Sequence, residues 1–188
     1  MDVKETELTG VLLLTPRRFG DHRGFFAETY SRRIHADLGI VIDFVQDNHS
    51  LSHDVSTVRG LHFQAPPHPQ AKLVRCGRGA IFDVAVDIRK GSPSYGHWAG
   101  YELSAENGAQ LFVPAGFAHG FATLEPNSEI VYKCSDYDAP ESEGAVLGAD
   151  PEIGIDWPLS CKATLSGKDA DAPLLADLES PFTWVDAA

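Results

Sequence analysis

Residues 108–119 read GAQLFVPAGFAH, and they carry the clearest fold signal in the chain. The four residues QLFV at 110–113 have the composition of a β-strand, and Pro114 and Gly116 then mark a turn. His119 follows that turn. Short strands that end at Gly and Pro turns indicate an antiparallel sandwich or barrel.

Other strand-like runs lie on both sides of this stretch, separated by Gly, Pro, Asn and Ser. They are expected at residues 11–14, 24–30, 43–46, 58–64, 72–76, 80–88, 98–103, 110–113 and 129–134. One helix is expected at 31–38, where Gly39 supplies the stop. The pattern predicts a single all-β domain over 1–188, with its barrel at about 10–135. Residues 140–188 have few apolar runs and are predicted to be a tail packed on the barrel.

Composition narrows the class of protein. The 188 residues are 43% hydrophobic and carry a formal charge of -12, so neither nucleic acid nor an anionic membrane is expected as a partner. The chain has no apolar run of roughly 20 residues and no signal-peptide pattern at its start. Its three cysteines are far apart, which favours reduced thiols and a cytoplasmic location, and Cys76 and Cys134 are expected in the core.

Strand 80–88 has two distinct faces. Val84 and Val86 share the apolar face, and Asp83 and Asp87 share the other with Ala85. The alternation of apolar and acidic residues by itself favours exposure of the face that carries Asp83 and Asp87 to solvent. The other possibility is that Asp83 lines a polar cavity. Five histidines without motif context are expected at the surface or in turns: His22, His35, His53, His68 and His97.

The spacing of Gly108, Pro114, Gly116 and His119 resembles the second conserved motif of the cupins, a superfamily of jelly-roll barrels. The first cupin motif would supply a His-x-His pair and a glutamate as metal ligands. Here residues 60–64 read GLHFQ, which puts Gln64 at the second histidine, and no glutamate follows at the usual distance. A transition-metal site needs at least three good ligands. The resemblance therefore implies a cupin-type jelly roll without a metal or an organic cofactor.

A narrower resemblance covers nearly the whole chain, in order and at matching spacing. The segments that carry it are FGDHRGFF at 19–26, FVQDNHS at 44–50, RGLH at 59–62, KLVRC at 72–76, FDVAVDIR at 82–89, LSAEN at 103–107, PAGFAHGF at 114–121, YK at 132–133 and LSGKDA at 165–170. Together they resemble the dTDP-4-dehydrorhamnose 3,5-epimerase family. That resemblance implies conversion of dTDP-4-dehydro-6-deoxy-D-glucose into dTDP-4-dehydro-L-rhamnose.

The implied reaction inverts C3 and C5, whose hydrogens are both alpha to the C4 ketone. Inversion needs a base on one face of the sugar, an acid on the other, and a group that stabilises the enolate oxygen. The resemblance implies that His62 is the base, with Asp169 as its carboxylate partner, and that Tyr132 is the acid. Lys72 would stabilise the enolate, assisted by His119.

The resemblance also implies a set of substrate contacts, and a homodimer in which the neighbour's N-terminal strands complete each site. The contacts are Arg23, Glu28, Gln46, Asp47, Asn48, Arg59, Lys72, His119, Glu143 and Lys168. Strict alternation would put Arg59 and His62 on opposite faces of their strand. A bulge at Gly60, or a site with more than one wall, would reconcile them.

Asp138 departs from the family pattern, because members commonly have a second tyrosine there that stacks on thymine. Either Tyr137 replaces it as the substrate contact, or nucleotide binding differs. Close alternatives are a C3-only epimerase and an epimerase of another nucleotide-linked 4-keto sugar. Two alternatives of other classes are a metal-dependent cupin enzyme and a non-catalytic sugar-binding barrel.

Overall fold

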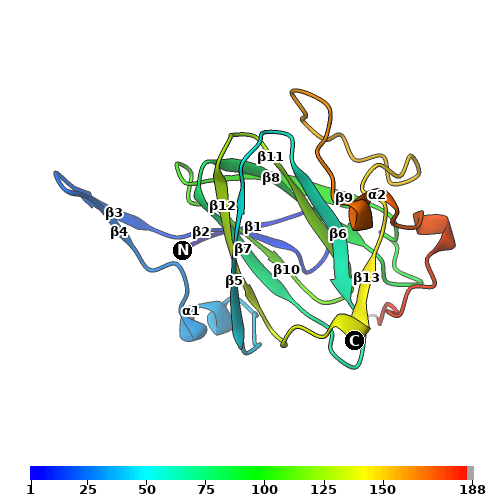
Figure 1. The fold of residues 1–188 in the computed structure, drawn as a ribbon. Helices are drawn as coiled ribbons and strands as arrows, with labels where there is room; N and C mark the ends of the chain where they lie inside the picture. The colour runs from blue at the N-terminus through cyan, green and yellow to red at the C-terminus, as the bar shows by residue number, and fades with distance from the viewer. Residues whose placement is uncertain (186–188) are drawn as a thin grey trace.

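The computed structural model describes residues 1–185, and its centre is a pair of facing antiparallel sheets (Figure 1). In sheet order, the six-stranded sheet contains β1 (Asp2–Glu5), β2 (Leu12–Thr15), β10 (Gln110–Val113), β7 (Lys72–Arg78), β12 (Ser128–Cys134) and β5 (Gln46–Ser52). The five-stranded sheet contains β13 (Glu143–Ala145), β6 (Val58–Gln64), β11 (Phe117–Thr123), β8 (Ala80–Asp87) and β9 (Trp98–Ser104). This arrangement confirms the predicted all-β jelly roll.

The main core lies between the two sheets. Val74 on β7, Leu111 on β10 and Ile130 on β12 point inward from one sheet, and Ile81 on β8 and Phe121 on β11 meet them from the other. All are at most 5% exposed. Burying large apolar side chains is worth roughly 1.5–3 kcal/mol each, so this layer holds the sheets together.

A second apolar layer covers the outer face of the five-stranded sheet. Val84 and Val86 of β8 pack there against Val146, Ile153 and Leu175 from the segment after residue 140. This segment also contains η1 (Pro140–Ser142), α2 (Gly167–Ala170) and η2 (Leu175–Asp177), and it runs along one side of the barrel (Figure 1). This confirms the predicted packing of the tail on the barrel for residues 140–185, and residues 186–188 lie outside the described part of the chain.

Because the tail covers its outer face, β8 is buried on both sides. The expectation that Asp83 and Asp87 face water is therefore wrong, since both are 0% exposed. Their side chains lie on the inner face of β8, where hydrogen bonds replace water. The alternation of side chains along the strand showed which residues share a face, but not which face is exposed to solvent.

The helix α1 (Arg32–Asp37) begins after Ser31 and ends before Gly39, close to the predicted limits. His35 is buried within it, at 1% exposure, so the prediction of a surface or turn position is wrong. Its Nδ1 atom lies 2.9 Å from the carbonyl of Ser31, and its ring packs 4.8 Å from that of Tyr30. None of the helices in the described part of the chain has the length and apolar character needed to cross a bilayer.

A hairpin made of β3 (Arg18–Asp21) and β4 (Gly24–Ala27) projects away from the barrel as an arm (Figure 1). Phe19, Phe25 and Phe26 on this arm are each more than half exposed. Large exposed apolar side chains gathered on one element are characteristic of an interaction surface.

Strand limits were predicted best where a proline closely follows the strand. β6 and β10 match their predicted ranges, and the strand expected at 43–46 lies instead at Gln46–Ser52 as β5. The sequence of β5, QDNHSLS, is polar because it is an edge strand with one face in solvent. β1, β3, β11 and β13 were not predicted as strands.

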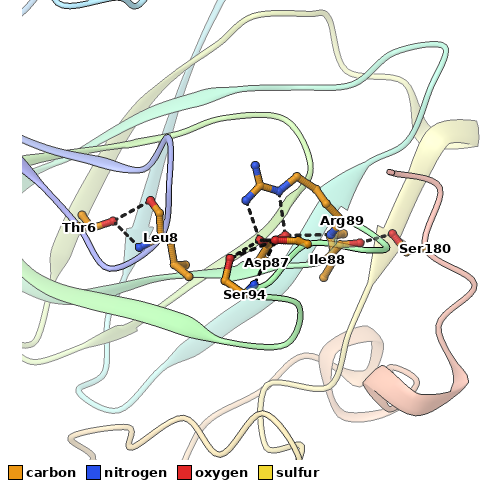
Figure 2. A network of polar contacts seen from close by, with 8 residues as sticks. Thr6, Leu8, Asp87, Ile88, Arg89, Ser94 and Ser180 are labelled. Atoms are coloured by element: carbon orange, nitrogen blue, oxygen red, sulfur yellow. Dashed lines mark hydrogen bonds and ion pairs between the residues drawn. The ribbon is translucent and has the colours of Figure 1, made fainter. Parts of the chain in front are cut away.

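Asp87, the last residue of β8, is buried and lies at the centre of a network of hydrogen bonds (Figure 2). Arg89 donates from Nε to Oδ1 at 2.8 Å and from Nη2 to Oδ2 at 2.6 Å, and the Ser92 and Ser94 hydroxyls also donate to Oδ2. Burial acts to raise the pKa of Asp87, but these hydrogen bonds outweigh it and hold the pKa below its ordinary value. Ser180 of the tail donates to the carbonyl of Ile88 beside this network.

We expect Asp87→Asn to lower the free energy of unfolding by about 3 kcal/mol at pH 7, because it leaves the guanidinium of Arg89 without its carboxylate. The folded pKa of Asp87 is depressed, so its stabilisation is present above the unfolded value of about 4 and is lost as pH falls through the folded pKa. Urea denaturation between pH 7 and pH 3 should therefore show the two proteins converging in acid. Asp43→Asn, which breaks an exposed pair with Arg32, is the control. Equal stability at pH 7 would contradict the prediction.

Candidate active site

A cavity of about 280 Å³ lies between the two sheets. Its walls come from β5, β6, β7, β11 and β12 and from the tail helix α2. The lining residues are Ser50, Arg59, His62, Lys72, His119, Phe121, Tyr132, Ser166, Lys168 and Asp169. The cavity therefore brings together all four predicted catalytic residues and three further predicted substrate contacts.

His62, on β6, is held by the tail. Its Nε2 donates to Asp169 Oδ1 at 2.6 Å, and Ser166 donates from Oγ to Asp169 Oδ2 at 2.8 Å. Asp169 is only 4% exposed. This hydrogen bond fixes the tautomer and leaves the lone pair on Nδ1, the atom that can accept a proton. Burial lowers the pKa of His62, against the opposing effect of Asp169, so the imidazole is neutral at pH 7 and suited to act as a base.

Tyr132 lies on β12, in the sheet opposite His62. Burial raises the pKa of Tyr132, and a hydrogen bond with the side chain of Asn48 acts in the other direction. Asn48 is its direct cross-strand partner on β5. The phenol therefore keeps its proton at neutral pH and can deliver it to a group in the cavity.

Lys72 and His119 supply polar groups from both sheets. Burial lowers the pKa of Lys72, and Cys134, Asp83 and Glu143 act to raise it. His119 donates from Nε2 to Oδ1 of buried Asp83 at 2.9 Å. Asp83 thus orients a histidine that lines the cavity, although Asp83 itself is not among the lining residues. The Lys72 side chain can donate a hydrogen bond to a developing oxyanion, and His119 can assist when Nδ1 also carries a proton, because its Nε2–H is already donated to Asp83.

A bulge at Gly60 puts Arg59 and His62 on the same cavity. Phe121 pairs with Arg59 and His119 pairs with His62, so two steps along β11 correspond to three along β6. The extra residue restores both side chains to one face. This confirms the bulge, which was one of the two ways of reconciling the pair. Gly60 has φ +109°, and a Cβ there would lie 2.6 Å from the carbonyl oxygen of His119.

The remaining predicted contacts on β5 divide between two faces. Gln46 and Asn48 share the inner face with Ser50, and Gln46 Nε2 donates to Asn48 Oδ1 at 2.9 Å. Asp47 points to the outer face, where it accepts hydrogen bonds from Lys133 at 2.9 and 3.1 Å. Within its own chain, Asp47 is thus turned away from the cavity.

The other contacts lie at the rim or farther away. Lys168 donates to Glu143 across the space between α2 and β13. Tyr137 is 65% exposed and follows β12. Arg23 and Glu28 do not line the cavity of their own chain, and Arg23 sits on the projecting arm, where it binds Asp21.

The donor atoms do not fit a metal centre of the cupin type. Gln64, at the position of the second cupin histidine, donates from Nε2 to the carbonyls of His68 and Tyr137 and accepts from the amide of Ala139. His119 already uses Nε2 on Asp83. Among residues 1–185, no three His, Cys, Asp or Glu side chains are placed to hold one ion.

Three lining residues were not predicted: Ser50, Phe121 and Ser166. Ser166 could have been found, because Ser-x-x-Asp at 166–169 is a helix-start signature. Its hydroxyl accepts from the amide of Asp169 at 3.1 Å as the N-cap of α2, so helix capping and orientation of the carboxylate share one side chain.

Sequence comparison connects this cavity with characterised enzymes. A family model described as dTDP-4-dehydrorhamnose 3,5-epimerase matches residues 5–177. The dTDP-4-dehydrorhamnose 3,5-epimerase of Salmonella typhimurium is 53% identical over 176 residues, which cover 93% of this chain and 96% of the relative.

Solved structures agree over the same length. The dTDP-6-deoxy-D-glucose-3,5-epimerase of Legionella pneumophila, in complex with dTDP-4-keto-L-rhamnose, superimposes with a TM-score of 0.94 at 43% identity and 99% coverage of both chains. A 3'-monoepimerase from Streptomyces bikiniensis, in complex with dTDP-quinovose, gives a TM-score of 0.85 at 35% identity, covering 91% of this chain and 86% of its own. With motifs, fold and cavity in agreement, the chain belongs to the dTDP-4-dehydrorhamnose 3,5-epimerase family.

Proposed function

We propose that the protein is an isomerase that epimerises dTDP-4-dehydro-6-deoxy-D-glucose at C3 and C5 to give dTDP-4-dehydro-L-rhamnose. The observation that carries this proposal is the placement of His62 and Tyr132 on facing sheets around one cavity. A sugar ring bound between them would have a base on one face and an acid on the other. That is the minimum requirement for inversion at a carbon alpha to a ketone.

In the proposed reaction, Nδ1 of His62 takes the proton from C3 or C5, and Asp169 stabilises the imidazolium that forms. The electron pair of the broken C–H bond moves to the C4 oxygen as an enolate, which Lys72 stabilises, with His119 assisting when both of its ring nitrogens carry protons. Tyr132 then donates its proton to the opposite face of the same carbon. Exchange with solvent returns a proton to Tyr132 and removes one from His62, which completes the cycle.

The diphosphate of the substrate needs cations, because the protein as a whole is acidic. Arg59 and Lys168 line the cavity and would face the phosphates, with Glu143 holding Lys168 in place.

We further propose a homodimer in which Arg23 and Glu28 of one copy complete the cavity of the other. The projecting arm with its exposed phenylalanines supports this arrangement. We place the enzyme in the cytoplasm, on the grounds that Cys76, Cys134 and Cys161 are all free thiols.

Proton NMR in deuterated water with dTDP-4-dehydro-6-deoxy-D-glucose tests the proposal. Deuterium at both C3 and C5, with the rhamno-configured sugar after reduction, is the expected result. Exchange confined to C3 would assign the protein to the mono-epimerases, whose known fold it shares. Absence of exchange at both carbons would overturn the proposal.

We expect Tyr132→Phe to reduce epimerisation by roughly 10²-fold or more while C–H exchange continues, because the phenyl ring retains its packing but has no proton to donate. The same NMR assay measures the ratio of exchanged to inverted product, which shows whether C–H exchange continues without inversion. Tyr101→Phe is the matched control, since the Tyr101 hydroxyl binds Glu7 outside the cavity. Unimpaired epimerisation by Tyr132→Phe would remove Tyr132 from the acid role.

A further inference from the structure

Gln64 makes hydrogen bonds that fix a segment next to the cavity. The 136–139 segment connects β12 to η1 and has no regular secondary structure. Gln64 Nε2 donates to the Tyr137 carbonyl at 3.0 Å, and Gln64 Oε1 accepts from the Ala139 amide at 3.0 Å. The same Nε2 donates to the His68 carbonyl. The side chain is 4% exposed and all three interactions are with backbone, so Gln64 ties two loops together.

Two more glutamines hold the same segment from other directions. Gln70 Nε2 donates to the Asp136 carbonyl at 2.9 Å. Gln46 Oε1 accepts from the Asp138 amide at 3.1 Å, and its Nε2 donates to Asn48. Every residue of the 136–139 segment thus has a backbone group bonded to a glutamine side chain from elsewhere in the chain.

The segment is coupled to the cavity through Tyr132. Asn48, which receives the hydrogen bond from Gln46, also bonds the Tyr132 side chain. The charge of Asp138 lies close enough to act on Tyr132, whose pKa it helps to raise. The 136–139 segment is thus linked through Gln46 and Asn48 to Tyr132, which lines the cavity, and the Tyr137 side chain in this segment is exposed.

We propose that Gln64 is a positioning residue that holds the 136–139 segment as a preformed wall for the nucleotide end of the substrate. This inference rests on the proposed function, which supplies the nucleotide. A segment ordered before binding does not lose conformational freedom when the ligand arrives, so its contacts contribute fully to affinity. An exposed tyrosine ring is also suited to stack on a planar base. The position that holds a metal ligand in metal-dependent cupins has here become a support for substrate binding.

We expect Gln64→Ala to weaken dTDP binding, and to raise the KM for the nucleotide sugar, by roughly 10-fold while kcat changes little. The reason is that His62, Asp169 and Tyr132 stay in place while the binding wall loses its order. Titration calorimetry with dTDP and steady-state kinetics measure the two effects separately. Asn107→Ala is the matched control, because the Asn107 amide also bonds three backbone groups, in a turn that does not line the cavity.

Two further variants keep the test decisive. Gln70→Ala removes a hydrogen bond to the same segment from a half-buried position, so it provides the answer if Gln64→Ala does not fold. Gln64→Glu keeps the acceptor for Ala139 but places a carboxylate against two carbonyls. Protonation of the introduced carboxylate restores a hydrogen-bond donor. The dTDP affinity of Gln64→Glu, relative to that of the parent protein, should therefore recover as pH falls.

The outcomes separate the two proposals. One outcome is that the parent protein binds dTDP and that Gln64→Ala binds it equally tightly. Gln70→Ala is used for this comparison if Gln64→Ala does not fold. In that case the inference is wrong and the proposed function stands. A loss of kcat with unchanged KM would also overturn it, because that would place the defect in the chemical step. If the parent protein does not bind dTDP, both proposals fail together.

Discussion

His62→Ala should lower the turnover number by roughly 10³-fold and leave the affinity for dTDP close to that of the parent protein. The substitution removes the lone pair that is proposed to accept the proton, and it does not touch Arg59 or Lys168, which would face the diphosphate. Single-turnover exchange of substrate hydrogen for deuterium measures the first effect, and titration calorimetry measures the second.

The result should be specific to this histidine. His97→Ala serves as the control, because His97 is exposed and does not line the cavity. A collapse of nucleotide affinity with normal residual turnover would show that His62 binds substrate rather than removing its proton.

The pH dependence of proton abstraction provides a second test of this role. Burial lowers the pKa of His62, so proton abstraction should persist below pH 6.5 and fail only when the imidazole itself becomes protonated.

Gly60→Ala should lower the free energy of unfolding by about 3 kcal/mol or more. At φ +109° a side chain is strained in any surroundings, and here its Cβ would lie 2.6 Å from the His119 carbonyl oxygen and 2.7 Å from the Cα of Gly120. Both contacts are with backbone, so β11 would have to move away from β6. Because His119 and His62 pair across these strands, activity should be lost with stability.

Urea denaturation compares this variant with Gly77→Ala on β7. At Gly77 an added Cβ would meet atoms no closer than 3.7 Å, so the control should change stability by less than about 1 kcal/mol. If Gly60→Ala were as stable as Gly77→Ala, the bulge would not require a glycine and its role in aligning Arg59 with His62 would need revision.

The strands of the barrel could be predicted because they alternate apolar and polar residues between clear turns. β6 was placed correctly on this basis, and β10 was placed by its apolar run and the turn at Pro114. β5 was misplaced because an edge strand that is wet on one face needs few apolar residues. The position of Asp83 depended on what covers β8, and that information lies more than 60 residues away in the tail.

The site was harder to predict than the fold for a similar reason. Motif resemblance named His62, Tyr132 and Asp169, and the structure places all three on one cavity. Spacing alone could not show that His62 and Tyr132 belong to facing sheets, because sheet membership depends on long-range pairing. It also separated Arg59 from His62, and only the register between β6 and β11 shows how one extra residue brings them together.

The location of Asp169 in the tail has a consequence for biosynthesis. Lys72, His119 and Tyr132 are all translated before Asp169, and the chain grows at roughly 5–20 residues per second. During that interval a nascent chain holds every barrel strand but lacks the carboxylate that orients His62. The hydrogen bond that orients His62 therefore cannot form until the tail has been synthesised. A premature stop codon before position 169 would remove Asp169 together with Leu175, which packs on the outer face of β8.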